Sequence, residues 1–213
     1  MVDLAFGATA MASIFAIVDP LGVVPFFSVL TEDMTPVQKQ QIVSKACLTA
    51  TITLGMFAIF GQWIFAAFGF TIPAFKIAGG ALLFVTAFQM TQGQRTSRRA
   101  ITEGGRDEET ESIGVVPLGI PLLAGPGAIT TVMIYMTRPD TDPFDKTFIF
   151  IGILIAVLLT FFLLRSASVI YRRVGKMGTI AFGRIMGLLL AAVGVQFVID
   201  GILQVARSSL LLP

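Results

Sequence analysis

The composition of this 213-residue chain is that of an integral membrane protein. Apolar residues make up 55% and charged residues 13%, and the mean hydropathy is +0.86, so there is too little polar surface to cover a soluble globule. One cysteine and no histidine exclude a disulfide framework and a histidine-based metal site or proton relay. We expect no metal, no cofactor and, at a net charge of only +2, no nucleic-acid partner.

The first apolar run, residues 4–31, is interrupted at the depth where a membrane helix should be continuous. Its interrupting residues are Asp19, Pro20, Gly22 and Pro25. Proline removes a backbone donor and clashes with the preceding turn, and glycine tolerates open backbone. We therefore expect two half-helices, with free carbonyls around Ile17 and Val18, and free amides at Leu21, Gly22 and Val23.

Two uninterrupted apolar runs follow, at residues 42–68 and 73–91. Each is long enough to cross a hydrocarbon core of about 30 Å. In the second run, Gly79 and Gly80 predict close helix contact, and Gln89 is expected either to hydrogen-bond to another helix or to line a pathway. Residues 92–113 then form a polar linker between the two halves of the chain.

The fourth apolar run, residues 114–137, is broken in the same way as the first. It contains Pro117, Pro121, Gly125, Pro126 and Gly127. The pattern again predicts two half-helices, with free carbonyls around Leu123 and Ala124, and free amides at Gly127, Ala128 and Ile129. Irregular backbone at membrane depth survives only where it is buried in protein or lines a wet cavity, so the two breaks should face one another.

The last two runs, residues 147–171 and 179–205, complete a second copy of the first half. The matched pairs are Pro20 with Pro126, Phe75 with Phe182, Gly80 with Gly187, and Gln89 with Gln196. Three spans in each half is an odd number, so the two halves must be inverted relative to each other. We expect an all-α integral membrane fold of six transmembrane segments in a 3+3 inverted repeat, with spans one and four broken mid-membrane. Residues 1–91 are the first repeat, 92–113 the cytoplasmic linker and 114–213 the second repeat of one membrane domain.

The distribution of basic residues predicts the orientation, because cytoplasmic loops carry the excess of Lys and Arg. One set of loops carries Lys39, Lys45, Arg95, Arg98, Arg99, Arg106, Arg172, Arg173 and Lys176. The opposite set carries Lys76, Arg138, Lys146 and Arg207. The chain is therefore expected to be a multi-pass protein with both termini outside.

Asp19 is an ionisable residue inside the first break, where a charge is costly and is by default a functional candidate. If it is buried, its pKa should rise, which suits a proton carrier or an ammonium site. An aspartate that precedes proline also caps a helix well, so a structural role is equally open. Its repeat mate is Gly125, and the second copy therefore has no matching carboxylate.

The two breaks suit a small zwitterion. Free amides at a helix start favour a carboxylate, and free carbonyls at a helix end accept from an ammonium group. Small residues around the breaks restrict the size of the ligand. The function expected is secondary transport of a small neutral amino acid by alternating access, coupled to protons or alternatively to sodium, within the lipid bilayer.

Other functions remain open in the sequence. The same broken helices could form a passive channel or facilitator, or an exporter of small solutes. A drug-resistance or regulatory membrane subunit is a further alternative. An enzyme is not expected, because the spans offer no histidine, no paired carboxylates and no serine with a base. No pattern predicts an oligomeric state.

The segments FAIVDPLGVVPFF and PLGIPLLAGPGAITTVM resemble the MarC family of bacterial and archaeal inner-membrane proteins, which includes the SnatA small neutral amino acid transporters. The resemblance covers essentially the full chain. It implies an inverted three-plus-three fold, an inner-membrane location and transport of the glycine, alanine and serine class. The site residues that it implies are Asp19, Pro20, Gly22, Pro25, Gly125, Pro126, Gly127, Ala128 and Thr130.

Overall fold

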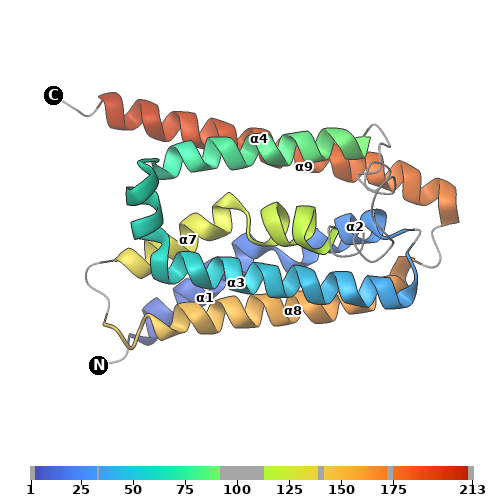
Figure 1. The fold of residues 1–213 in the computed structure, drawn as a ribbon, viewed down its shortest axis with the longest axis horizontal. Helices are drawn as coiled ribbons and strands as arrows, with labels where there is room; N and C mark the ends of the chain where they lie inside the picture. The colour runs from blue at the N-terminus through green and yellow to red at the C-terminus, as the bar shows by residue number, and fades with distance from the viewer. Residues whose placement is uncertain (1–2, 33, 92–112, 139–141, 172–174, 211–213) are drawn as a thin grey trace.

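The structure, a computed structural model, is all-helical wherever it describes the chain, at residues 3–32, 34–91, 113–138, 142–171 and 175–210. Side chains of residues 89–90, 168–171, 175–183 and 209–210 are not described. The elements are α1 (Leu4–Val18), α2 (Pro20–Leu30), α3 (Pro36–Phe68), α4 (Ile72–Thr91), η1 (Gly114–Leu123), α7 (Pro126–Thr137), α8 (Thr147–Tyr171) and α9 (Gly175–Leu210). Both termini lie at the same end of the helices (Figure 1).

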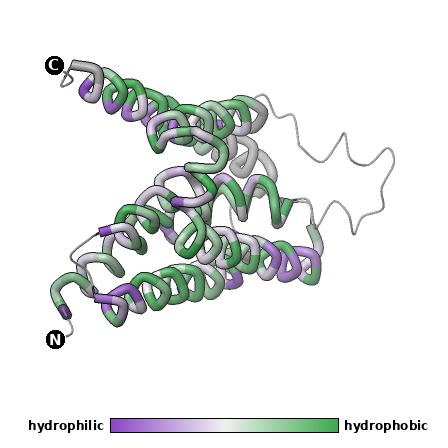
Figure 2. The backbone as a smooth tube through the Cα atoms, turned by 60° about the vertical axis from the view of Figure 1, so that its left-hand side comes forward, coloured by the Kyte–Doolittle hydropathy of each residue, from purple (hydrophilic) through white to green (hydrophobic). Residues whose placement is uncertain are grey.

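Several helices are long and apolar enough to cross a membrane. They are Leu4–Leu30, Pro36–Phe68, Thr147–Ala167 and Arg184–Ser208, and the bent pair Gly114–Leu123 with Pro126–Thr137 would add a fifth. The apolar part of α4, Ile72–Phe88, is shorter. The chain is thus a multi-pass membrane protein with four or five candidate spans among the residues that the structure describes, and the predicted count of six is not confirmed. Apolar residues run along most of the helical length (Figure 2).

Local sequence signals explain where the helices begin and end. Asp3 accepts from the amides of Ala5 and Phe6 and starts α1. Thr35 and Gln38 form a capping box that starts α3, with proline at the first helical position. Gly69, at φ 68°, ends α3 in the left-handed conformation that glycine adopts without strain. These caps satisfy orphan donors and acceptors at the helix ends.

The buried side chains form two separate clusters. The larger cluster draws on α1, α2, α3, η1, α7 and α8, which we call the core body. The smaller contains Leu83, Ala87 and Leu190, all from α4 and α9. Figures 1 and 2 show α4 and α9 side by side and set apart from the other helices. We call these two helices the α4/α9 pair.

The α4/α9 pair is antiparallel and very closely packed. A Cβ on Gly80 would lie 2.5 Å from the carbonyl oxygen of Gly194, and one on Gly187 would lie 3.0 Å from that of Ala87. One on Gly201 would lie 2.8 Å from the oxygen of Pro73. Each step of seven residues along α4 therefore matches a step of seven back along α9. The predicted close helix contact is thus confirmed at Gly80, which faces α9, and at Gly79, which faces Pro126 of α7.

Several contacts between helices form pairs. If the first half of the chain were exchanged with the second, each contact of a pair would take the place of the other. In such an exchange α1 corresponds to η1, α2 to α7, α3 to α8 and α4 to α9. The structure has α1 on α8 and η1 on α3, and it has α2 on α8 and α7 on α3. It likewise has α2 on α9 and α7 on α4, and α1 on α7 and η1 on α2. These four sets of contacts are exchanged between the halves, whereas the contacts of η1 on α4 and of α7 on α8 have no equally strong counterpart between α1 and α9 or between α2 and α3.

Candidate functional site

The first break lies at Asp19, as predicted, where α1 ends and α2 begins. Asp19 has φ 46° and ψ 66°, a left-handed conformation that is uncommon outside glycine, asparagine and aspartate. Its amide donates to the carbonyl of Phe15 at 3.1 Å and closes α1. Pro25 lies inside α2 and does not interrupt it. The predicted break is therefore a single residue, and α1 and α2 still read as one apolar span of 27 residues.

Asp19 also caps α2, so fewer backbone amides are free at the start of α2 than the sequence predicts. Its Oδ1 accepts from the Gly22 amide at 3.0 Å, and its carbonyl oxygen accepts from the Val23 amide at 3.3 Å. The expectation of three free amides is thus wrong for Gly22 and Val23, because the preceding aspartate satisfies them. Leu21, next along the chain, is 66% exposed. The start of α2 already holds a carboxylate of the chain itself.

Glycine at position 22 is needed for this cap. A Cβ at Gly22 would collide with the carboxylate of Asp19, so any larger residue would displace that carboxylate. Asp19 itself is exposed rather than buried in this single chain. The burial of Asp19 that the sequence left open is therefore not observed. The hydrogen bond from the Gly22 amide to its carboxylate shows the helix-cap role. Pro20 and Val23 beside it are buried.

The second break differs, because the start of α7 has no side-chain cap. Gly125 is the cap residue, with extended backbone. Its carbonyl accepts from the Ile129 amide at 3.0 Å, so the expectation of a free amide is wrong for Ile129. Pro126 follows as the first helical residue, and the amides of Gly127 and Ala128 come next. A helix start of this kind presents positive charge, and no acidic side chain among the described residues caps it.

The chain around this second helix start is buried on all sides. All residues from Leu123 to Thr130 are buried. Ala128 is 2% exposed and Thr130 is also 2% exposed. The Thr130 hydroxyl donates to the carbonyl of Gly127 at 3.1 Å, so its own hydrogen bond is made within α7. The second break is therefore a buried helix start without a side-chain cap.

The segment before the second break is irregular for a reason written in the sequence. Val116 and Ile120 have extended backbone inside η1, and each precedes a proline. The proline ring disfavours helical backbone at the preceding residue. The Ala124 amide reaches back to the Gly119 carbonyl at 2.9 Å and closes the segment. η1 and α7 then meet at an angle of 54°.

Two side chains and one glycine from other helices lie against the second break. A Cβ at Gly127 would lie 2.9 Å from Cζ of Phe197 on α9 and 3.1 Å from Cδ1 of Ile17 on α1. A Cβ at Gly79 on α4 would lie 2.5 Å from the Pro126 ring. Because Ile17 precedes Asp19 by two residues, this contact brings the two breaks together. Sequence reasoning did not identify Phe197 as part of the site, although Phe197 directly follows the repeat-matched Gln196, and it named Ile17 for its carbonyl rather than for its side chain.

Comparison with known proteins adds the family. A family model described as "MarC family integral membrane protein" matches residues 4–206 of the chain. The chain belongs to the MarC family. A UPF0056 membrane protein of Methanocaldococcus jannaschii is 38% identical over 94% of this chain and 97% of its own length. One from Pyrococcus horikoshii is 42% identical over 88% and 90%, and YhcE of Escherichia coli is 35% identical over 89% and 88%. No solved structure matches the chain.

Of the two repeat-matched glutamines, Gln89 and Gln196, the structure of this MarC protein describes the side chain of Gln196. Gln196 is exposed, and its Nε2 donates to Oδ1 of Asp200 at 2.8 Å. The two side chains are one turn apart on α9, so this bond lies within one helix and is not the bond between helices that was one of the two alternatives. The side chain of Gln89 lies outside the described residues. Gln196 therefore belongs to the surface of α9 and not to the break.

The MarC chain also has a cavity away from the breaks. It measures about 280 Å³ and lies between the end of α3, the start of α4 and the end of α7. Its lining is formed by Gln62, Phe65, Phe70, Thr71, Ile72, Met133 and Thr137. Across the described ranges, no three His, Cys, Asp or Glu side chains gather as a metal site would need. The cavity adjoins the α3–α4 turn.

Proposed function

We propose that this MarC-family protein is a secondary transporter of small neutral amino acids of the glycine, alanine and serine class, working by alternating access. The observation that carries this proposal is the buried, uncapped start of α7 at Gly127 and Ala128, in contact with Ile17 beside the first break. A buried helix start without an acidic partner favours a small anionic group. An amino acid carboxylate meets that requirement.

The two breaks offer different chemistry to the two ends of a zwitterion. The start of α2 is occupied by the Asp19 carboxylate, so it has no need of an anion. In the proposal the substrate carboxylate lies against the amides of Gly127 and Ala128, and its ammonium group lies toward Asp19. One carboxylate of the chain and one uncapped helix start then balance the two charges of a neutral amino acid.

The size of the substrate follows from what covers the break. Phe197 and Ile17 approach so closely to Gly127 that even a methyl group there would press on both. Binding therefore needs Phe197 or Ile17 to move aside, and a ligand with a very small side chain needs the smallest movement. Bulky aromatic compounds fit this arrangement poorly, which disfavours drug efflux.

The proposal includes an inverted 3+3 repeat, in which α4 and the bent pair of η1 with α7 both count as spans. The exchangeable sets of helix contacts support it, since a two-fold axis in the membrane plane would produce that pattern. The antiparallel packing of the repeat mates α4 and α9 is also what such an axis requires. Residues 1–91 and 114–213 are then the two repeats and 92–113 the linker.

The driving force in the proposal is a proton gradient, with Asp19 as the proton-carrying group. The exposed position of Asp19 beside the break gives a proton access to it. Sodium is the alternative, because free carbonyls at the end of a half-helix can coordinate it. The proposed location is the inner membrane of a bacterium or archaeon, with both termini outside.

The test is uptake of labelled glycine, alanine and serine into proteoliposomes that contain the purified protein. Proton and sodium gradients are imposed separately, and each unlabelled amino acid is added in excess as competitor. Saturable uptake and counterflow under one gradient would support the transporter and identify its ion. Uptake that neither saturates nor shows counterflow would indicate a channel, and no uptake of any of the three would contradict the proposal.

A further inference from the structure

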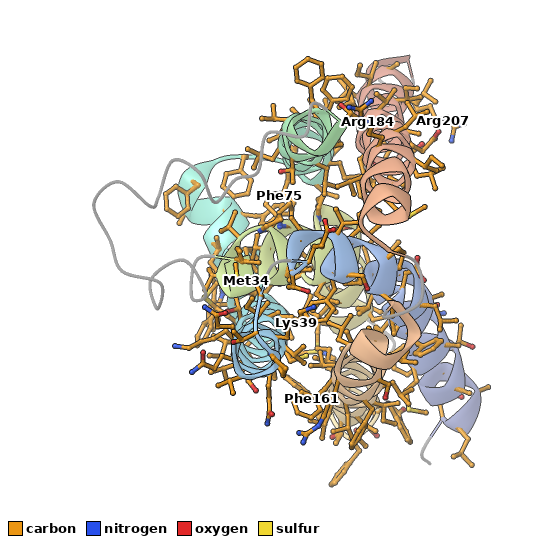
Figure 3. All side chains as sticks on the ribbon, turned by 90° about the vertical axis from the view of Figure 1, so that its right-hand side faces the viewer. Met34, Lys39, Phe75, Phe161, Arg184 and Arg207 are labelled. Carbon is orange, nitrogen blue, oxygen red and sulfur yellow. The ribbon has the colours of Figure 1, made fainter. Side chains whose placement is uncertain are left out.

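The packing divides the chain into two bodies that meet at few places. Buried side chains of the core body and of the α4/α9 pair form separate clusters. Phe26 and Leu122 of the core body reach the smaller cluster, and Phe75 reaches from α4 to the larger one (Figure 3). A protein whose interior is divided in this way can move along the division without exposing either cluster's centre.

Within the α4/α9 pair, the contact is between backbones. At Gly80 and Gly194 each residue faces the carbonyl oxygen of the other, with no side chain between them. The same closeness recurs one heptad away on both sides, at Gly187 and Gly201. Helices that pack through small residues gain dispersion contacts along their whole length. Separation of α4 from α9 would lose all of these contacts at once, so the pair should move as a unit.

Between the pair and the core body, the contacts at the second break are made by single side chains. Gly79 on α4 receives the ring of Pro126, and Phe197 on α9 covers Gly127. Neither contact is held by a hydrogen bond or an ion pair among the described residues. Rotation of the α4/α9 pair would lift both contacts together. The space that opens would be next to the buried amides of Gly127 and Ala128.

The described covalent link between the bodies is a short turn. α3 ends at Phe68 and α4 begins at Ile72, with Gly69 at φ 68° between them. No atom lies within 4 Å of a Cβ built on Gly69, so the turn is free of packing on that side. The 280 Å³ cavity adjoins the same turn and includes Thr71 and Ile72. Gly69 can absorb backbone rotation as a hinge residue. The rings of Phe65, Phe70 and Phe75 pack against one another across the turn and would shift with it.

We propose that the α4/α9 pair rocks as one rigid body over the core body, and that Phe197 is the gate residue with which it closes the second break. The role of Phe197 as a gate for a solute rests on the proposed function. The movement of the α4/α9 pair relative to the core body does not depend on it. In one position of the pair, the Phe197 ring covers Gly127 against Ile17. In the other, the ring leaves with α9 and a small solute reaches Gly127 and Ala128.

The experiment measures two distances by spin labelling in lipid nanodiscs, in a Cys47→Ala background. Labels at Ala74 and Arg207, both exposed, report the distance within the α4/α9 pair. Labels at Phe144, which is 78% exposed, and Arg207 report the distance between the core body and the pair. Each pair is measured alone, with glycine or alanine, and with Phe197→Ala. Ile199→Ala is the matched control, because Ile199 lies on the same helix and is 43% exposed.

The within-pair distance is expected to stay single and unchanged throughout. The between-body distance is expected to show a second population, or to shift, with amino acid or with Phe197→Ala, and to be unaffected by Ile199→Ala. A within-pair distance that changes as much as the between-body distance would overturn the rigid pair. A between-body distance that stays single under every condition would overturn the motion and the gate.

Failure of the proposed function gives a different result. In that case Phe197→Ala still shifts the between-body distance, whereas glycine and alanine have no effect on it and no amino acid is taken up in proteoliposomes. That combination supports two-body motion and rejects the amino acid substrate. Uptake without any change in the between-body distance rejects the inference and keeps the transporter.

Discussion

Gly80 of α4 and Gly194 of α9 face each other across an antiparallel helix pair, each against the backbone of the other. A Cβ on Gly80 would lie 2.5 Å from the Gly194 oxygen, and a Cβ on Gly194 would lie 2.7 Å from the Gly80 oxygen. This reciprocal contact leaves no room for a methyl group on either residue. It sets the distance between the two helices and so the geometry of the body that approaches the second break.

The first prediction is that Gly80→Ala destabilises the fold. The added methyl group must displace the Gly194 backbone, because a carbonyl oxygen cannot move aside as a side chain can. Overpacking of this kind costs about 1–3 kcal/mol. The measurement is the unfolding midpoint in detergent, by heat or by titration with a denaturing detergent.

Gly55→Ala is the matched control for that prediction. Gly55 lies in α3, and a Cβ built on it has no atom within 4 Å. Helix propensity alone then favours alanine by about 1 kcal/mol. An equal loss of stability in both variants would show that Gly80 is not under steric constraint and would contradict the packing described for the α4/α9 pair.

The second prediction separates the two roles of Asp19. Asp19→Asn keeps an oxygen that can accept from the Gly22 amide, and asparagine tolerates the left-handed backbone. Its stability should therefore match that of the wild type, whereas Asp19→Ala should lose about 1 kcal/mol with the helix cap. If the carboxylate carries the proton, Asp19→Asn also loses uptake driven by a pH gradient.

The measurement combines unfolding in detergent with gradient-driven uptake in proteoliposomes. Uptake that remains fully coupled in Asp19→Asn would remove Asp19 from the proton role and leave it a cap. Equal destabilisation by the asparagine and alanine variants would instead contradict the cap. Counterflow without a gradient serves as the control, since it needs substrate binding but no coupling ion.

Local chemistry was enough to locate both breaks and the close helix contacts. Pro20 and Pro126 each begin a helix, and the glycines of α4 and α9 lie where their lack of a side chain permits close approach. These features depend on one residue and its near neighbours in the chain. The family was also correctly recognised from the segments around the two breaks.

Features that depend on residues far apart in the chain were not predicted. Phe197 covers Gly127 across 70 positions of sequence, and no pattern within α9 distinguishes it from other aromatic residues in apolar helices. The cap of Gly22 by Asp19 is local by contrast, and it was one of two open alternatives until the backbone geometry showed the hydrogen bond. The six-span count depends on α4, whose apolar stretch is short.

The third prediction concerns a polar contact between the two broken segments. The hydroxyl groups of Ser13 on α1 and Tyr135 on α7 lie 2.9 Å apart, partly buried. Tyr135→Phe removes this hydrogen bond and should cost about 0.5–1.5 kcal/mol. A double-mutant cycle with Ser13→Ala isolates the pairwise energy, because Tyr135 also packs edge-on against Phe6. A coupling energy near zero would mean that the two hydroxyl groups do not interact in the membrane.

The last prediction tests the covered helix start itself. Gly127→Ala places a methyl group 2.9 Å from Cζ of Phe197 and 3.1 Å from Cδ1 of Ile17, so it should fill the space proposed for the substrate. Glycine uptake should fall by about tenfold or more, since an unfavourable contact of about 1.4 kcal/mol already has that effect. The measurement is initial uptake rate at several glycine concentrations, on protein whose unfolding midpoint has been checked.

Adding Phe197→Leu to the Gly127→Ala variant shows how the alanine lowers glycine uptake. If the methyl group acts by pressing on the aromatic ring, the shorter leucine side chain should restore much of the uptake. If it acts by blocking the Gly127 and Ala128 amides directly, the double variant should remain as inactive as Gly127→Ala alone. Full activity of Gly127→Ala by itself would contradict the proposed site, because no substrate could then lie against that helix start without meeting the added methyl group.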